Sequence, residues 1–304
     1  MTFIGTTVIG LEDAAIKETD GKLSSEGRVS FEKLPKSPLT LNTIYELITS
    51  FQFKDLDDIK ERIKKEKITL EGTYKCLCKR KGEQSFNSMI IEHEIGKIID
   101  QNNKDLEYSR ENPETIIYID IFNKNCNVGI LKERNLSKRT YRFHLNNQTT
   151  PTLVAACLIK HFNIKKEETL LCINCKDGVI PIEATLQNIK VTSQDSNPNN
   201  IRNAEINAKL AKKEINLQLK NIDQIEGKHD YIITQIIFSK DKKGPHRKIN
   251  DIFQLAKNNL KKKLAIITNH PEDIKIFCPK EIKLNEEKQI QHGGLKLTLQ
   301  IFSL

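Results

Sequence analysis

The sequence predicts an α/β protein in which α+β units precede a doubly wound parallel sheet. Two observations carry this prediction. From about residue 151 onward, apolar runs typical of strands alternate with segments whose apolar residues recur at helical spacing, and such alternation favours a parallel sheet. The 304 residues are also enough for two domains, each with a core of its own.

The first unit covers about residues 1–60. We expect a strand after Phe3, a helix over residues 11–17 and a second strand over residues 28–31, where apolar and polar residues alternate. Two prolines then break the chain. Leucines and isoleucines over residues 41–48 recur at helical spacing, which predicts another helix.

The second unit covers about residues 60–145. A strand is expected over residues 73–79, an amphipathic helix over residues 91–99 and an apolar strand over residues 115–121. The polar stretch over residues 137–149 predicts a linker to the third unit.

The third unit begins at Pro151, which we expect at the first helical position with Thr150 as the N-cap. Helices are expected at residues 151–162, 182–188, 200–213 and 248–262. Strands are expected at residues 169–173, 189–193, 215–220, 229–234, 263–268, 273–278 and 295–303.

The composition bounds the class of protein. A formal net charge of +9 favours a polyanionic partner, nucleic acid before membrane, while a solvated lysine-rich surface explains the charge equally well. No apolar run reaches the ~20 residues of a membrane span, and the first residues do not resemble a signal peptide. Seven scattered cysteines fit a reducing compartment, so we expect a cytoplasmic protein with no membrane contact.

Residues 171–184 lead from an expected strand into an expected helix, where a nucleotide or S-adenosylmethionine site places its glycine loop. The loop keeps one glycine, Gly178, and it has no acidic residue at the strand end. Lys176 stands where a backbone approaches a ligand closely. The stretch therefore has the outline of a cofactor site with altered chemistry.

Five segments, in this order and spacing, resemble the THUMP-domain class I (Rossmann-like) RNA methyltransferases, and most of all the tRNA guanine-N2-methyltransferases. The segments are residues 78–82 (Cys-Lys-Arg-Lys-Gly), 85–88 (Ser-Phe-Asn-Ser), 112–114 (Asn-Pro-Glu), 136–142 (Leu-Ser-Lys-Arg-Thr-Tyr-Arg) and 179–184 (Val-Ile-Pro-Ile-Glu-Ala). The resemblance implies a ferredoxin-like domain over residues 1–60, an RNA-binding THUMP domain over residues 61–145 and a Rossmann-like methyltransferase domain over residues 146–304.

The resemblance also implies S-adenosylmethionine as the cofactor. The family's first loop reads Asp-Pro-x-Cys-Gly-Ser-Gly-Thr, and these eight positions run here from Cys172 to Val179. Cys172 replaces the acidic residue and Lys176 the first glycine, and both changes argue against cofactor binding. If binding is retained, the implied contacts are Cys172, Cys175, Gly178, Asp195 for the ribose and Asn221 for the adenine amino group. Ordinary loop polar residues remain the alternative for Asp195 and Asn221.

The family's catalytic loop reads Asn/Asp-Pro-Pro-Tyr/Phe, in which rigid acceptors align the guanine amino group for methyl transfer. Here the positions are Gln235, Ile236, Ile237 and Phe238. Gln235 keeps an amide on a longer side chain, both prolines are lost, and the aromatic residue remains. We therefore expect Gln235 and Phe238 to be vestigial catalytic positions. An active S-adenosylmethionine-dependent tRNA (guanine-N2) methyltransferase with a divergent site is the alternative.

The expected partner is tRNA or another structured RNA, bound through basic and hydroxyl side chains. The candidate RNA-binding residues are Lys79, Arg80, Ser85, Ser88, Lys138, Arg139, Arg142, Lys242, Lys243 and Arg247. A solvated lysine-rich loop is the alternative for residues 240–248. An active methyltransferase subunit is the second expected partner, and a protein–protein scaffold without RNA affinity is a third interpretation.

The pair Cys172 and Cys175 has the Cys-x-x-Cys spacing of redox and zinc sites. A structural zinc site needs four ligands, and neither a second such pair nor a histidine pair is spaced to complete one. We expect no metal.

Overall fold

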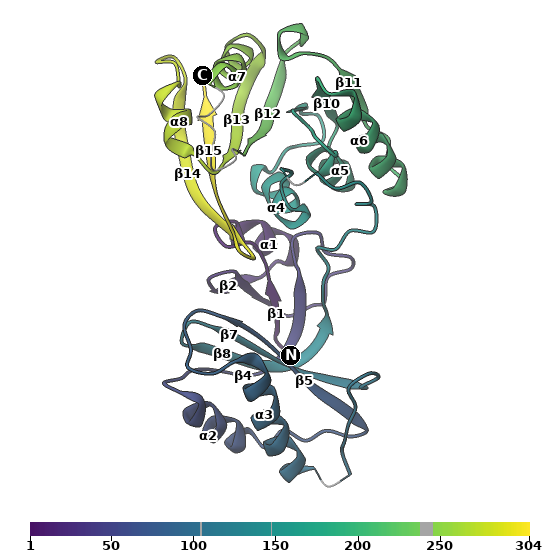
Figure 1. Cartoon of the computed structure of the whole chain (residues 1–304), viewed down its shortest axis with the longest axis vertical. Coiled ribbons are helices and arrows are strands. Elements are labelled where there is room, and N and C mark those ends of the chain that lie inside the picture. The colour runs from purple at the N-terminus through teal and green to yellow at the C-terminus, as the bar shows by residue number, and fades with distance from the viewer. Residues whose placement is uncertain (104, 147, 238–245) are drawn as a thin grey trace. The chain divides into compact units, whose positions relative to one another are not determined.

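The computed structural model describes residues 1–103, 105–146, 148–237 and 246–304 (Figure 1). The chain divides into two compact units. The first unit comprises Met1–Thr6, Ser30–Leu34 and Asn42–Asn135. The second unit comprises Thr7–Val29, Pro35–Leu41 and Leu136–Leu304.

The first unit is built on a sheet whose strands follow one another in the order β1-β4-β8-β7-β5-β6. The strands are β1 (Phe3–Thr6), β4 (Thr43–Gln52), β5 (Thr73–Lys81), β6 (Glu107–Tyr108), β7 (Thr115–Phe122) and β8 (Asn125–Glu133). Two helices, α2 (Leu56–Glu66) and α3 (Ser88–Asn102), bury their isoleucines against one face of this sheet. Both helices begin at a side-chain cap, Asp55 for α2 and Asn87 for α3, which each accept a backbone N–H at 2.9 Å.

The second unit holds a seven-stranded sheet in the order β11-β10-β9-β12-β13-β15-β14. Its strands are β9 (Leu170–Ile173), β10 (Val191–Asp195), β11 (Asn216–Leu219), β12 (His229–Ile236), β13 (Leu260–Thr268), β14 (Lys283–His292) and β15 (Leu295–Ser303). Its helices are α1 (Glu12–Thr19), α4 (Thr152–Phe162), α5 (Val179–Leu186), α6 (Pro198–Leu210), η1 (Ile222–Gln224), α7 (His246–Asn259) and α8 (Pro271–Ile276). The short strands β2 (Lys22–Ser25) and β3 (Arg28–Phe31) complete the described elements.

The first five strands of that order are parallel, and β15 is antiparallel to both β13 and β14. The strand order reverses between β9 and β12, which is the topological switch point where open α/β sheets bind ligands. The predicted α/β fold class is confirmed.

Helices cover both faces of this sheet because successive strand residues point to opposite sides. Cys172 and Ile233 face a core shared with α1, α4 and α5. Leu171 and Ile232, their neighbours in sequence, face a second core shared with α7 and α8. The carboxyl ends of β9, β10 and β12 are thereby held in fixed register beneath the loops that follow them.

Three predicted elements are wrong. Residues 41–48 lie largely in strand β4 and not in a helix. A β-bulge between Leu47 and Thr49 breaks the two-residue period of β4, so its apolar residues fall at a spacing that also suits a helix. Residues 273–278 fall largely in helix α8, which has a proline in its first turn. The polar stretch 137–149 is no free linker, because Tyr141 is buried among α5 and α6 residues.

Candidate functional site

The loop after β9 has the backbone conformation of a glycine-rich loop, although most of its residues carry side chains. Asn174, Lys176 and Gly178 have φ angles of 54°, 56° and 82°, in the left-handed region. Asparagine tolerates this region, whereas lysine there costs roughly 1–2 kcal/mol. The loop therefore has a conformation that glycine adopts freely, although only one of the three positions is glycine.

Gly178 is required for packing as well as for its φ angle. A Cβ built at this position would lie 2.9 Å from the Cβ of Ala204 in α6. The glycine thus lets α5 begin close to α6, and it does not itself line a cavity described below.

Asp195, at the end of β10, holds the loop in place. Its carboxylate is buried and accepts hydrogen bonds from the backbone N–H of Lys176 at 3.0 Å, from the backbone N–H of Asn197 at 2.9 Å and from the side chain of Asn200 at 3.0 Å. The neighbouring Gln194 and Ser196, and not Asp195, line the cavity beside this strand.

Cys172 and Cys175 are buried in the apolar core. Burial raises the pKa of both thiols well above the usual value, so neither forms a thiolate readily. Within the described part of the chain, no group of three or more His, Cys, Asp and Glu residues is arranged to hold a metal ion. No described helix is long and apolar enough to cross a membrane.

A cavity of about 740 Å³ opens at the carboxyl ends of the parallel strands, a size typical of ligand sites. Asn174 lines it from the loop after β9, Gln194 from β10, and Asn221 from the loop before η1. Arg247 and Lys248 line it from α7. The side-chain oxygen of Gln194 is buried and has no partner among the described residues. We refer to this space as the large cavity.

Gln235, near the end of β12, is oriented by Thr150. The carboxamide oxygen of Gln235 accepts hydrogen bonds from the backbone N–H of Thr150 at 2.6 Å and from its hydroxyl at 2.5 Å. Because a backbone N–H can only donate, the atom that faces it must be the oxygen. The carboxamide nitrogen therefore points away from Thr150, and it is buried without a partner among the described residues.

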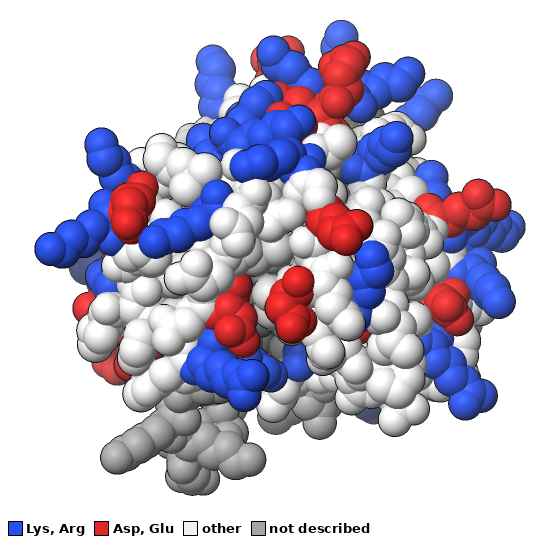
Figure 2. All heavy atoms as spheres, turned by 90° about the horizontal axis from the view of Figure 1, so that it is seen from above, with Lys and Arg blue, Asp and Glu red and all other residues white. Residues whose placement is uncertain are grey.

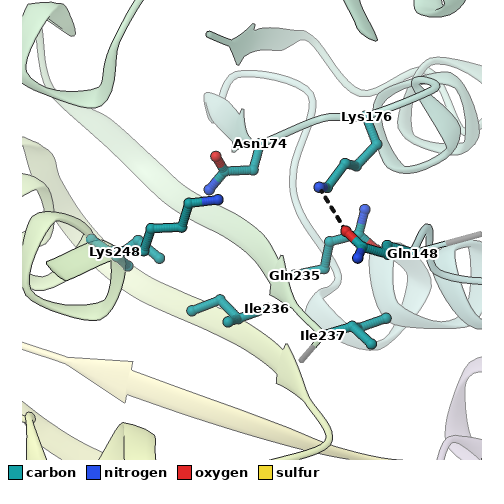
Figure 3. A pocket seen from close by; sticks show the side chains of 8 residues that line it. Gln148, Asn174, Lys176, Gln235, Ile236, Ile237 and Lys248 are labelled. Atoms are coloured by element: carbon teal, nitrogen blue, oxygen red, sulfur yellow. Dashed lines mark hydrogen bonds between the residues drawn. The ribbon is translucent and has the colours of Figure 1, made fainter. Parts of the chain in front are cut away.

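A smaller cavity of about 60 Å³ lies beside Gln235 (Figure 3). Its described lining consists of the carboxamides of Gln148, Asn174 and Gln235, two lysines, Lys176 and Lys248, and the isoleucines Ile236, Ile237 and Ile252. None of these described lining residues is a carboxylate. We refer to this space as the Gln235 cavity.

Lys176 points across the Gln235 cavity, and its ammonium lies 3.5 Å from the side-chain oxygen of Gln148 (Figure 3). Partial burial lowers the pKa of Lys176. The negative charge of Asp195 opposes this shift, and the positive charge of Lys248 adds to it. The two lysines reach this place from different elements, the β9 loop and α7, so the sequence does not reveal that they are neighbours.

The predicted RNA-binding residues of the second unit differ in their availability. Arg139 is tied to Glu183 at 2.8 Å, and Arg142 lies 3.5 Å from Asp177. Lys138 is exposed, and Arg247 lines the large cavity. On the face drawn in Figure 2, basic side chains lie mainly around the rim with acidic ones among them.

The predicted RNA-binding residues of the first unit lie where β5 leads toward α3. Lys79, Arg80 and Ser85 are exposed, and Ser88 begins α3. Arg80 donates a hydrogen bond to Gln84 at 2.7 Å, which leaves the exposed guanidinium anchored to the loop. Three predicted site residues, Phe238, Lys242 and Lys243, lie outside the described residues.

Residues 52–131 match the model of the THUMP domain. The chain carries a THUMP domain. It is also 26% identical over 207 residues to a tRNA (guanine(6)-N2)-methyltransferase of Archaeoglobus fulgidus, in an alignment that covers 60% of this chain and 53% of the relative. The chain therefore matches about half the length of that curated relative.

The fold of the whole THUMP-containing chain is similar to that of known structures. TrmN from Thermus thermophilus has a TM-score of 0.79 and 17% identity, with 99% of this chain and 98% of TrmN covered. A possible methylase from Clostridium difficile 630 has a TM-score of 0.80 and 16% identity, with coverage of 99% and 97%. The methyltransferase candidate SMU.472, solved with SAH, has a TM-score of 0.77 and 15% identity, with coverage of 99% and 97%. The resemblance to THUMP-domain, Rossmann-like methyltransferases is confirmed.

Sequence reasoning did not place Gln148 and Thr150 in the site, whereas Lys248 belongs to the basic run considered over residues 240–248. Thr150 was expected as an N-cap, but the described α4 has Pro151 at that position without a side-chain cap. The Thr150 hydroxyl is instead used by Gln235, 85 residues away. The sequence shows only that Thr150 carries a hydroxyl and follows an expected linker. It does not show that this hydroxyl binds Gln235.

Proposed function

We propose that this chain is a tRNA-directed RNA-binding protein that keeps the methyltransferase fold and has lost methyl transfer. It acts in the cytoplasm as a binding or stabilising subunit for an active methyltransferase. In this proposal residues 1–60 form the ferredoxin-like domain, residues 61–145 the THUMP domain and residues 146–304 the methyltransferase-like domain. The THUMP match, the name of the curated relative and the net charge of +9 support an RNA partner.

The orientation of the Gln235 carboxamide is the main support for the proposed loss of methyl transfer. A site that methylates an exocyclic amino group needs acceptors for the N–H groups of that amine, so that its lone pair faces the methyl donor. The acceptor oxygen of Gln235 is already bonded twice to Thr150, and the atom left over is a donor. The cavity beside it offers an amine two further cationic donors, Lys176 and Lys248.

The adenosine half of S-adenosylmethionine fits the described cavities better than the half that carries the sulfonium. The large cavity, with Asn221 and the unpaired oxygen of Gln194, suits the size and hydrogen-bonding groups of an adenosine. The sulfonium half would approach Lys176 and Lys248, and two like charges ~5 Å apart cost about 3 kcal/mol at an effective dielectric constant near 20. The residues present do not fit the methyl-donating end of the cofactor, and we derive no methyl-transfer step.

An active S-adenosylmethionine-dependent methyltransferase is the second candidate. The left-handed backbone at Asn174, Lys176 and Gly178, together with the large cavity at the switch point, favours it. The structural neighbour solved with SAH has the same fold. In this candidate Lys176 would turn outward or pair with the methionine carboxylate.

The RNA part of the proposal is tested by binding of unmodified tRNA to the full chain as the salt concentration is varied. We expect affinity to fall linearly with the logarithm of salt concentration, because lysines and arginines displace counterions from phosphates. A Lys79→Gln/Arg80→Gln variant should bind more weakly and with a shallower salt slope. A control of equal charge, Lys54→Gln/Lys65→Gln, changes two other exposed lysines of the first unit. Absence of tRNA binding even at low salt would contradict the proposal and favour a protein scaffold.

A further inference from the structure

The described lining of the Gln235 cavity holds two cations, Lys176 and Lys248, and one unpaired buried donor, the carboxamide nitrogen of Gln235. Its described polar lining comprises two lysines and three carboxamides, without a carboxylate. Gln235 is only 4% exposed, and its carboxamide nitrogen has no partner among the described residues. An unpaired buried donor costs roughly 1–3 kcal/mol, so a structure that retains one leaves a position for an acceptor from outside the chain.

The charge of the cavity specifies the kind of acceptor. Lys176 and Lys248 come from opposite sides of the opening, and each lowers the cost of an anion between them (Figure 3). The volume of about 60 Å³ holds roughly four water molecules, which is comparable to one tetrahedral oxyanion. A cationic or purely donor ligand is disfavoured by the same groups.

The adjoining large cavity extends the site. Asn174 and Lys248 line both spaces, so a ligand held at the Gln235 cavity can continue into the large one. The large cavity offers the unpaired acceptor of Gln194 and the carboxamides of Asn221 and Asn258, which suit the hydrogen-bonding edge of a base or the hydroxyls of a ribose.

We propose that the Gln235 cavity binds the phosphate group of a nucleoside phosphate, with Lys176, Lys248 and the carboxamide nitrogen of Gln235 as its donors. The phosphate would lie where, in a methyltransferase of this fold, the methyl donor meets the target amine. An anionic ligand group would then occupy the position of the cationic sulfonium. The phosphate comes from a free nucleotide or from RNA, and only the RNA source rests on the proposed function.

The test is calorimetric titration of the full chain, at constant ionic strength, with inorganic phosphate, with adenosine 5′-monophosphate and with adenosine. We expect saturable binding of phosphate and tighter binding of the monophosphate, whereas adenosine binds at least about tenfold more weakly than the monophosphate. Removal of a charged donor costs about 1.5–3 kcal/mol, so a Lys176→Gln/Lys248→Gln variant should lose at least about tenfold in affinity for phosphate.

Two further variants control for the loss of a surface charge and for a folding defect. Lys209→Gln removes one exposed charge at the end of α6 and should leave phosphate binding unchanged. Lys176→Gly removes the cation at a position whose φ of 56° glycine accepts without strain, so a loss of binding there is not a folding defect. Equal phosphate affinity in the parent chain and in both Lys176 variants would overturn the proposal.

Competition with tRNA distinguishes the two sources. If the phosphate belongs to RNA, tRNA displaces adenosine 5′-monophosphate, and the Lys176→Gln/Lys248→Gln variant loses tRNA affinity. If it belongs to a free nucleotide, tRNA and the monophosphate bind independently. A chain that binds phosphate but no tRNA overturns the proposed function and leaves the phosphate site standing.

Discussion

The carboxamide oxygen of Gln235 is held by Thr150 through two hydrogen bonds, one from the backbone N–H and one from the hydroxyl. Two consequences follow from this pair. The acceptor of Gln235 is removed from the cavity, and its donor is left facing Lys176 and Lys248 across the lining. The same side chain thus explains both the proposed loss of methyl transfer and the proposed binding of an anion.

Gly178→Ala should destabilise the second unit by about 3 kcal/mol. Alanine at φ 82° is strained by roughly 1 kcal/mol, and its Cβ would also meet the Cβ of Ala204 at 2.9 Å. Gly227→Ala is a matched control, because Gly227 has a φ of 86° and no atom within 4 Å of the added Cβ. Urea unfolding of both variants separates strain from collision, and equal losses would show that Ala204 gives way freely.

Glu183→Gln should cost about 3–5 kcal/mol, because it leaves the guanidinium of Arg139 buried without its counter-charge. The side chain of Glu183 is fully buried, and it accepts hydrogen bonds from Arg139 and from the Tyr141 hydroxyl, each at 2.8 Å. Glu61→Gln breaks the exposed pair with Lys64 and should cost less than about 0.5 kcal/mol. Similar unfolding free energies for the two variants would contradict this account of the buried pair.

Asp13 makes the free energy of unfolding of the second unit depend on pH in the acidic range. Burial raises the pKa of Asp13, but the hydrogen bond and charge of His161 and the ion pair with Lys17 outweigh it and lower the pKa from 3.8 to about 2. A depressed carboxyl pKa stabilises the fold above pH ~4 and stops doing so as the pH falls through ~2. Because Asp13 is half-exposed, we discount this stabilisation to about 1 kcal/mol.

Asp13→Asn should therefore cost about 1 kcal/mol at pH 6 and close to nothing at pH 2. Unfolding free energies measured across this range give the difference between the variant and the parent chain. Asp57→Asn, at an exposed carboxylate on α2, is the control. A difference that stays constant from pH 6 to pH 2 would contradict the assignment.

The fold class was predictable because strand and helix periods alternate regularly in the second half of the chain. The failures have local physical causes. The bulge in β4 imitates helical spacing, and β14 is an edge strand whose charged and polar residues leave no apolar run in the sequence. The bulge in β4 forms in its pairing with the distant strand β8, whereas β14 pairs with β15, the next strand along the chain.

The site was predictable only in part. The loop at residues 171–184 and Gln235 follow from the order of segments along the chain. The contact with Thr150 and the meeting of Lys176 with Lys248 do not, because they join residues 85 and 72 positions apart through the fold. The ribose contact that the resemblance implies for Asp195 stays a prediction, and the described hydrogen bonds of Asp195 are to the loop and to α6.

In the proposed function the site at the ends of β9 and β12 does not transfer a methyl group. The most direct measurement combines calorimetric titration of the full chain with S-adenosylmethionine and transfer of a labelled methyl group to unmodified tRNA. We predict no saturable heat of binding and no label in the tRNA above that of a protein-free control. Tight, saturable binding together with label that accumulates in proportion to the protein concentration would contradict the account.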